Sequence, residues 1–254
     1  MRTSRSALAA IPLAAFLLAP LMTAAAEPPQ PVAAAETYGQ VLSEYQNAER
    51  DFSAAYQNAT TDAERQKLFN EKYPDRDKYA ARMVAVASAR PDDSASVDAA
   101  AWAVSYTFNG AAHDAALKLL SERYAANGKI TEAVQRLAYS QSPAAADALR
   151  KIVETNPNPT IKGYAAFALG QNLVNHDKSA EAQKVFEDVV AKYGDVKGGR
   201  GTLAEAAKGQ LHEIRDLAVG KVAPEIEGQD VEGHPLKLSD YRGKVVVLDF
   251  WGDW

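Results

Sequence analysis

Hydrophobic side chains recur at steps of three and four residues over most of the chain, from residue 37 to residue 218. A clear example is the stripe formed by Tyr38, Val41, Leu42, Tyr45, Phe52 and Tyr56. This spacing places side chains on one face of an amphipathic helix. No segment before Val219 alternates hydrophobic and polar residues convincingly, as a half-buried strand would. The pattern therefore predicts an all-helical region over residues 37–218.

Capping and turn residues mark the expected ends of these helices. Thr61 and Glu64 have the spacing of a capping box, and Pro74 closes the short helix that follows. Residues 91–94 (PDDS) open another helix. The other boundaries that we expect are helix ends at Asn109-Gly110 and Asn127-Gly128, an N-cap and first-turn proline at Ser142-Pro143, a loop at residues 156–159, and a last helix from Leu203 to Ala218.

Residues 162–195 carry the most legible helical-hairpin pattern. Leu169-Gly170 provides a small residue where the first helix meets its partner, and Ala182 and Phe186 fit the second helix. The stretch resembles a tetratricopeptide repeat, although the usual Trp, Tyr and closing Pro are absent. One hairpin of this kind cannot bury its own hydrophobic face, so neighbours must stack on it. The array then either presents a concave surface to a protein or peptide, or serves as a spacer.

The pattern changes after Val219. Ala223-Pro224 begins an extended piece, and Glu232-Gly233 marks a turn between two short extended segments. Residues 238–241 (LSDY) predict a single helical turn. The last ten residues, 245–254 (VVVLDFWGDW), are rich in branched and aromatic side chains without polar alternation. Such a run is typical of a strand covered on both faces inside a mixed sheet.

The pieces GKVAP, EG, LSDYRGK and VVVLDFWGDW, in this order and spacing, resemble the opening of a redoxin domain. Redoxins are thioredoxin-fold proteins that include the alkyl hydroperoxide reductase/thiol-specific antioxidant group and TlpA-like thiol-disulfide oxidoreductases. In that family the sequence Phe-Trp-x-x-Trp is followed at once by a Cys-x-x-Cys active site. This chain ends one residue short of the first cysteine. The resemblance thus implies a truncated thiol-disulfide oxidoreductase. The intact parent protein would reduce disulfides, form them or act on peroxides, and the chain as given would be inactive.

Three residues match the surroundings of the active site in that family. Trp251 and Trp254 would flank the missing cysteine, and Asp249 corresponds to the buried acid that thioredoxins use as a proton acceptor. Burial in an apolar strand raises the pKa of a carboxyl group toward neutrality, which suits proton transfer. The alternative is structural, with both tryptophans in a core and the aspartate bonded to backbone. We expect no cofactor and no metal in this chain. The resemblance implies protein disulfides or a redox partner protein as partners.

Composition narrows the remaining function classes. The 28 basic and 33 acidic residues give a net charge of −5, which argues against a nucleic acid as the main partner. The chain has no cysteine, so disulfides and thiolate metal sites are excluded. His212-Glu213 lacks the second histidine that a zinc protease motif requires four residues later. We interpret this histidine as structural or surface-exposed.

The N-terminus has the pattern of a cleavable export signal. Arg2 and Arg5 precede the apolar run of residues 7–22, and Ala24-Ala25-Ala26 supplies small residues for cleavage. A membrane anchor is the alternative, but the run is somewhat short for a span of about 20 residues. We therefore expect an exported, periplasmic or otherwise extracytoplasmic protein with no membrane span after cleavage.

Together these patterns predict a mainly α fold, in which a helical-hairpin array precedes the first strands of a truncated thioredoxin-like α/β domain. Two functions stay open: part of an exported thiol-disulfide oxidoreductase, or a non-catalytic extracytoplasmic module whose helices bind a protein or peptide. The expected domains are a signal peptide at 1–26, a Pro/Ala-rich linker at 27–36, the helical array at 37–218 and the redoxin fragment at 219–254.

Overall fold

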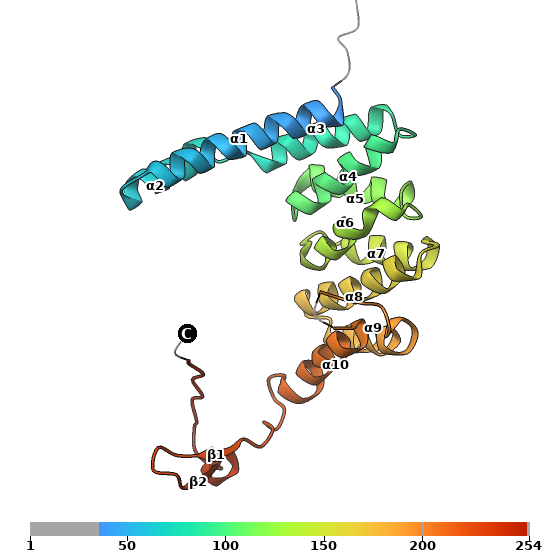
Figure 1. The fold of residues 1–254 in the computed structure, drawn as a ribbon. Helices are drawn as coiled ribbons and strands as arrows, with labels where there is room; N and C mark the ends of the chain where they lie inside the picture. The colour runs from blue at the N-terminus through green and yellow to red at the C-terminus, as the bar shows by residue number, and fades with distance from the viewer. Residues whose placement is uncertain (1–35, 200, 253–254) are drawn as a thin grey trace, which may run out of the picture. The chain divides into compact units, whose positions relative to one another are not determined.

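The described part of the chain comprises residues 36–199 and 201–252 of a computed structural model. The expected signal peptide and almost all of the expected linker lie outside these residues. Helices dominate up to residue 217, which confirms the mainly α prediction (Figure 1). The helices are α1 (Tyr38–Asn58), α2 (Asp62–Lys72), α3 (Arg76–Ala89), α4 (Ser94–Tyr106), α5 (Gly110–Glu122), α6 (Thr131–Arg136), α7 (Ala145–Thr155), α8 (Pro159–Asn175), α9 (Ser179–Tyr193) and α10 (Leu203–His212).

Short helical turns extend some of these helices. A 3₁₀ turn, η1 (Gly128–Ile130), precedes α6, and a second, η2 (Leu137–Tyr139), follows it. A π-helical turn, η3 (Glu213–Leu217), continues α10 almost to the expected end of the last helix. These turns add backbone hydrogen bonds where the regular helices stop.

The C-terminal segment forms a small local unit. Strands β1 (Glu227–Gln229) and β2 (Pro235–Lys237) pair antiparallel, and η4 (Leu238–Tyr241) follows as one 3₁₀ turn. The turn predicted at Glu232-Gly233 connects the strands, with Gly233 at a φ of 86°. The backbone N–H of Leu238 donates to Ile226 at 2.9 Å and ties η4 to the hairpin. The hairpin and the helical turn are confirmed.

Local capping explains where several helices begin. In α2 the Oγ1 of Thr61 accepts from the N–H of Glu64 at 3.2 Å, and the Glu64 carboxylate accepts from the N–H of Thr61 at 3.2 Å. This is the predicted capping box. Asp93 caps α4 by accepting from the N–H of Ala95 at 3.0 Å. Because such bonds involve neighbours in sequence, the residue pattern alone locates them.

Three boundaries differ from those expected. Gly110, with a φ of 89°, begins α5 instead of ending α4. Ser142 caps a turn before α7, whose helical residues begin only at Ala145. Pro159 belongs to α8 as its first residue, with Asn158 as the N-cap. A proline is compatible with this position because the first helical N–H needs no partner within the helix.

Most helices bury a hydrophobic face against neighbours along the chain (Figure 1), whereas α2 contains no buried residue. Helix α8 is central to this packing, since it contacts α6, α7, α9 and α10. Its Gly170 lies against the ring of Phe186 in α9, and a Cβ at this position would come within 2.5 Å of the ring. Phe186 itself is fully buried. The small residue that the sequence places here is required by the close approach of the two helices.

Polar contacts between successive hairpins repeat at a nearly constant spacing. The amide Nδ2 of Asn156 donates to the carbonyl of Ala125 at 2.7 Å, and that of Asn172 donates to the carbonyl of Ser140 at 3.0 Å. Further contacts of this kind link partners separated by 31 to 35 residues: Arg123–Asp92, Lys129–Asp98, Arg150–Glu181, Asn172–Leu137 and Tyr164–Lys197. Two further contacts of this kind span 29 residues (Asn156–Asn127) and 37 residues (Asn175–Ala138). A recurring separation in this range is what stacked hairpins of similar length produce.

His113 joins α5 to the end of η2 in the core. Its Nδ1 lies 3.2 Å from Oγ1 of Thr107, and its Nε2 lies 2.7 Å from Oγ of Ser140. The side chain is buried, and burial lowers its pKa from the ordinary value of 6.5. The folded protein therefore holds this histidine neutral, because burial disfavours the charged imidazolium.

We predict that Gly170→Ala destabilises the protein by roughly 1–3 kcal/mol, since the added methyl group overlaps the Phe186 ring in a packed core. Gly209→Ala in α10 is the matched control, because no atom lies within 4 Å of its Cβ position. That control should raise the free energy of unfolding by up to about 1 kcal/mol through helix propensity. Urea denaturation followed by circular dichroism measures both; equal effects would refute the packing account.

We predict that the free energy of unfolding falls as the pH drops from 7.5 to 5.5. Below 6.5 the unfolded chain protonates His113, whereas the folded chain resists the proton, so acid favours unfolding. His113→Gln removes this titration and should show a weaker loss of stability over the same pH range. Urea denaturation at both pH values provides the test, and an identical loss in the variant would contradict it.

Candidate functional site

The predicted site residues lie in the C-terminal run, residues 245–252. This run forms no strand, and Trp251 is 83% exposed. Asp249 is also exposed, whereas the prediction placed it in a buried strand. Trp254 lies outside the described residues. The expected strand is therefore wrong for the run as the structure shows it, because no neighbouring strand among the described residues pairs with it.

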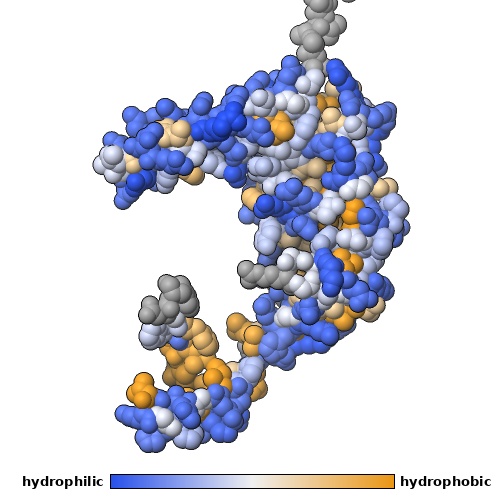
Figure 2. Space-filling model, in the orientation of Figure 1, coloured by the Kyte–Doolittle hydropathy of each residue, from blue (hydrophilic) through white to orange (hydrophobic). Residues whose placement is uncertain are grey.

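The C-terminal run is the most exposed hydrophobic stretch of the described chain. Val245 is 97% exposed, Val247 88% and Phe250 83%. Hydrophobic residues gather over this C-terminal part in Figure 2. Branched and aromatic side chains in this number are normally buried. The run therefore has the composition of a buried strand, although its side chains are exposed to solvent.

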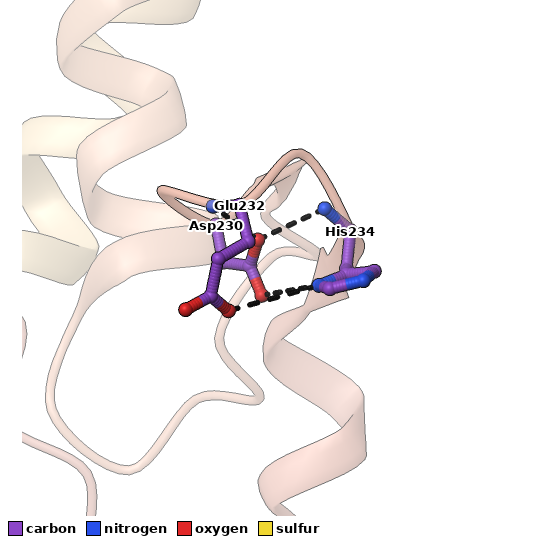
Figure 3. Close-up of side chains that lie close together, drawn as sticks. All are labelled: Asp230, Glu232 and His234. Atoms are coloured by element: carbon purple, nitrogen blue, oxygen red, sulfur yellow. Dashed lines mark hydrogen bonds and ion pairs between the residues drawn. The ribbon is translucent and has the colours of Figure 1, made fainter.

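A second cluster lies in the turn between β1 and β2, where Asp230, Glu232 and His234 approach one another (Figure 3). Oδ1 of Asp230 accepts from the backbone N–H groups of Glu232 and His234, both at 2.9 Å. The His234 N–H is the main cause that lowers the pKa of Asp230 below its ordinary value. Nδ1 of His234 lies 3.2 Å from Oδ2 of the same aspartate.

These three side chains could each offer one atom to a cation, since the atoms lie within 4.8 Å of one another. All three residues are exposed, and the bonds of Asp230 to the backbone account for its orientation. Such side chain to backbone bonds are the ordinary means of closing an Asx-type turn. We assign the cluster to the stability of the hairpin. The sequence pattern gave no sign of it, because these residues meet only when the turn forms.

A groove of about 690 Å³ lies on the helical array, between α6 with η2, α8 and the loop that leads into α10. Tyr139, Tyr164 and Phe167 provide its aromatic surface, and Tyr139 is 59% exposed. Oη of Tyr164 donates to the carbonyl of Lys197 at 2.6 Å and holds the loop against α8. The remaining lining residues are Glu132, Gln135, Arg136, Ala168, Gln171, Gly198, Gly199, Thr202, Leu203 and Ala206.

Besides the hydroxyl of Tyr139, four polar side chains of this groove form no hydrogen bond or ion pair with the described residues. They are Glu132, Gln135 and Arg136 from α6, and Gln171 from α8. Both charge signs and two amides are thus available to a ligand. The sequence analysis did not identify this groove, because which helices would face one another was not readable from the sequence.

Comparisons with known proteins give short matches to thiol-disulfide oxidoreductases. The chain is 55% identical over 38 residues to the thiol-disulfide oxidoreductase ResA of Geobacillus kaustophilus, a match that covers 15% of this chain and 22% of the relative. It is 53% identical over 38 residues to ResA of Geobacillus thermodenitrificans. It is 38% identical over 47 residues to ResA of Bacillus cereus, which covers 18% of this chain and 27% of the relative.

Part of the chain is therefore similar to thiol-disulfide oxidoreductases. The chain spans only about a quarter or less of the length of these curated relatives. No family model matches the chain. No solved structure matches it either. Among the described helices, none combines the length and apolar character needed to cross a bilayer.

We predict that trypsin cuts the folded chain first in the C-terminal segment, after Lys221, Arg242 or Lys244. These residues are exposed and lie outside the packed helices, and such segments open to proteases at little cost in free energy. Lys151 and Lys162, in α7 and α8, should be cut much later. Mass spectrometry of early time points identifies the sites, and first cuts within α7 or α8 would contradict the prediction.

Proposed function

We propose that this chain is part of an exported thiol-disulfide oxidoreductase in which a helical array precedes the redox module. The observation that carries this proposal is the identity of 55% over 38 residues to a ResA protein. That length is close to the length of residues 219–254, where the redoxin-like motifs lie. The given sequence contains no cysteine, so the proposal assigns the exchanging thiols to a part of the protein beyond Trp254.

The local structure of the C-terminal segment is consistent with this proposal. The extended piece, the hairpin and the 3₁₀ turn follow one another in the order of the redoxin-like motifs. Oε1 of Glu225 accepts from the N–H of Ser239 at 2.9 Å and helps to hold this order. The exposed run that follows would be covered once the remaining strands and helices of a thioredoxin-like sheet were present.

The proposed chemistry is thiol-disulfide exchange. A thiolate attacks one sulfur of the substrate disulfide, forms a mixed disulfide and releases the other substrate sulfur as a thiolate. The second cysteine then attacks the mixed disulfide, so that the substrate leaves as a dithiol and the protein becomes the disulfide. In this scheme Asp249 accepts the proton of the second thiol, and Trp251 and Trp254 shape the apolar rim of the site.

Export is part of the same proposal. The basic lead, the apolar run of residues 7–22 and the alanines at 24–26 support it. Disulfide chemistry on protein substrates also suits a compartment outside the cytoplasm, where disulfides persist. A protein disulfide or a redox partner protein is the substrate class that fits this location.

A second function is favoured by the groove on the helical array. It has the volume of an ordinary ligand site and an exposed aromatic wall. The spacing of 31 to 35 residues between hairpin contacts supports the tetratricopeptide-like interpretation of the array. In this proposal residues 37–218 bind a protein or peptide, with or without an attached redox module.

We predict that the gene continues in frame past the Trp254 codon with a Cys-x-x-Cys pair. The complete protein should then reduce insulin disulfides in the presence of dithiothreitol faster than dithiothreitol alone, whereas the 254-residue chain should not. Changing the first of these cysteines to serine should abolish the gain, because it removes the attacking thiolate. A stop codon directly after Trp254 in independent isolates would refute the redox proposal.

We predict that Asp249→Asn in the complete protein slows insulin reduction at pH 7 by about tenfold or more, the effect expected from the loss of a proton acceptor. The loss should shrink at pH 9, where the thiol ionises without help. Asp240→Asn, in η4, is the matched control and should leave the rate unchanged. A pH-independent loss of rate would instead assign Asp249 a structural role.

A further inference from the structure

The groove on the helical array combines an apolar surface with acidic, basic and amide side chains. Tyr139 and Phe167 present aromatic surface from η2 and α8, and Leu203 and Ala206 of α10 also line the groove. The amides of Gln135 and Gln171 and the charges of Glu132 and Arg136 line the same groove. A ligand must therefore offer both an apolar group and hydrogen-bonding groups.

The charges exclude some ligand classes. Glu132 and Arg136 place one acid and one base on the same helix, so a polyanion or a polycation would meet a like charge. Each amide side chain, by contrast, donates and accepts hydrogen bonds at once. A polypeptide backbone has the complementary property, because every residue except proline carries one donor and one acceptor.

A folded protein does not present exposed aromatic side chains and unpaired backbone groups together. Its aromatic side chains are mostly covered, and its backbone groups are already paired within secondary structure. An extended or unfolded segment exposes both at once. The combination of aromatic wall and uncommitted amides thus fits an extended chain better than a native surface.

We propose that the groove binds an extended segment of unfolded polypeptide, with an aromatic side chain of the ligand against Tyr139 and Phe167 and its backbone on Gln135 and Gln171. This inference rests on the second proposed function and names its ligand. It is independent of the redox proposal. An unfolded client is also the form in which a protein exposes cysteines for exchange, so both activities would act on the same substrate class.

The test uses the 254-residue chain and one probe in two forms. The probe is ribonuclease A, either native or reduced and carbamidomethylated so that it stays unfolded without added charge. Biolayer interferometry measures binding of the chain to each immobilised form. Binding to the unfolded form, at least tenfold tighter than to the native form, is the expected result.

Variants then locate the binding surface. Tyr139→Ala should weaken binding to the unfolded probe at least tenfold, as expected for an aromatic anchor at the centre of an interface. The double change of Gln135 and Gln171 to Ala should weaken it about fivefold, the loss of ordinary hydrogen bonds. The matched controls lie on α2: Phe69→Ala removes an aromatic side chain that is 51% exposed, and Gln66→Ala removes an exposed amide. Both controls should stay within twofold of the unchanged chain.

The exposed hydrophobic side chains of the C-terminal run could bind an unfolded probe non-specifically. A chain with Phe250→Ser and Trp251→Ser should keep its binding, and a loss there that exceeds the loss in Tyr139→Ala would overturn the inference. Self-association that Tyr139→Ala abolishes, without probe binding, would assign the groove to a second copy and overturn it as well. Thermal unfolding by circular dichroism confirms that each variant is folded.

The two proposals fail in different ways. Binding to native ribonuclease A as tight as to the unfolded form would overturn the ligand class but leave protein binding by the array. Binding to neither form would overturn both the ligand class and the second function. The redox proposal is tested separately, by the codons beyond Trp254 and by the insulin assay.

Discussion

The structure depends on one constraint: a helical hairpin can hide its hydrophobic face only against the next hairpin. Helix α8 illustrates it, since α6, α7, α9 and α10 all contact it and most of its surface is buried. Buried polar groups then fix the stacking. Asn172 must find carbonyl partners, and it finds them 32 and 35 residues earlier, in the preceding hairpin. An unpaired buried amide would cost about 1–3 kcal/mol, so these bonds favour one register of stacking over others.

The same stacking generates the groove. Tyr139, Phe167 and Ala206 belong to elements far apart in sequence, and they line one surface only because η2, α8 and α10 follow one another in space. The C-terminal segment is held together by local contacts and not by stacked hairpins. Its hairpin closes through local bonds at Asp230, whereas the run that follows pairs with no strand among the described residues. One chain thus joins a packed helical array to a small hairpin and an exposed hydrophobic run.

The sequence could predict features that depend on neighbouring residues, but not features that depend on contacts between distant elements. Helix starts at Thr61 and Asp93 and the turn at Gly233 depend on neighbours within a few residues, so local patterns were sufficient. The requirement for a small residue at Gly170 was also readable, from a resemblance to a known hairpin. The groove was not, because it depends on which helices face one another across tens of residues. The run at 245–252 has the sequence of a covered strand, and its exposure depends on partners that the described residues do not supply.

Hydrogen–deuterium exchange of the 254-residue chain tests the central claim most directly, because it follows each amide. If the hairpins support one another, amides of α4 to α9 should be protected together and should lose protection at the same urea concentration. Amides of residues 245–252 should exchange within seconds. Separate transitions for α4–α5 and α8–α9, or slow exchange in residues 245–252, would contradict the account.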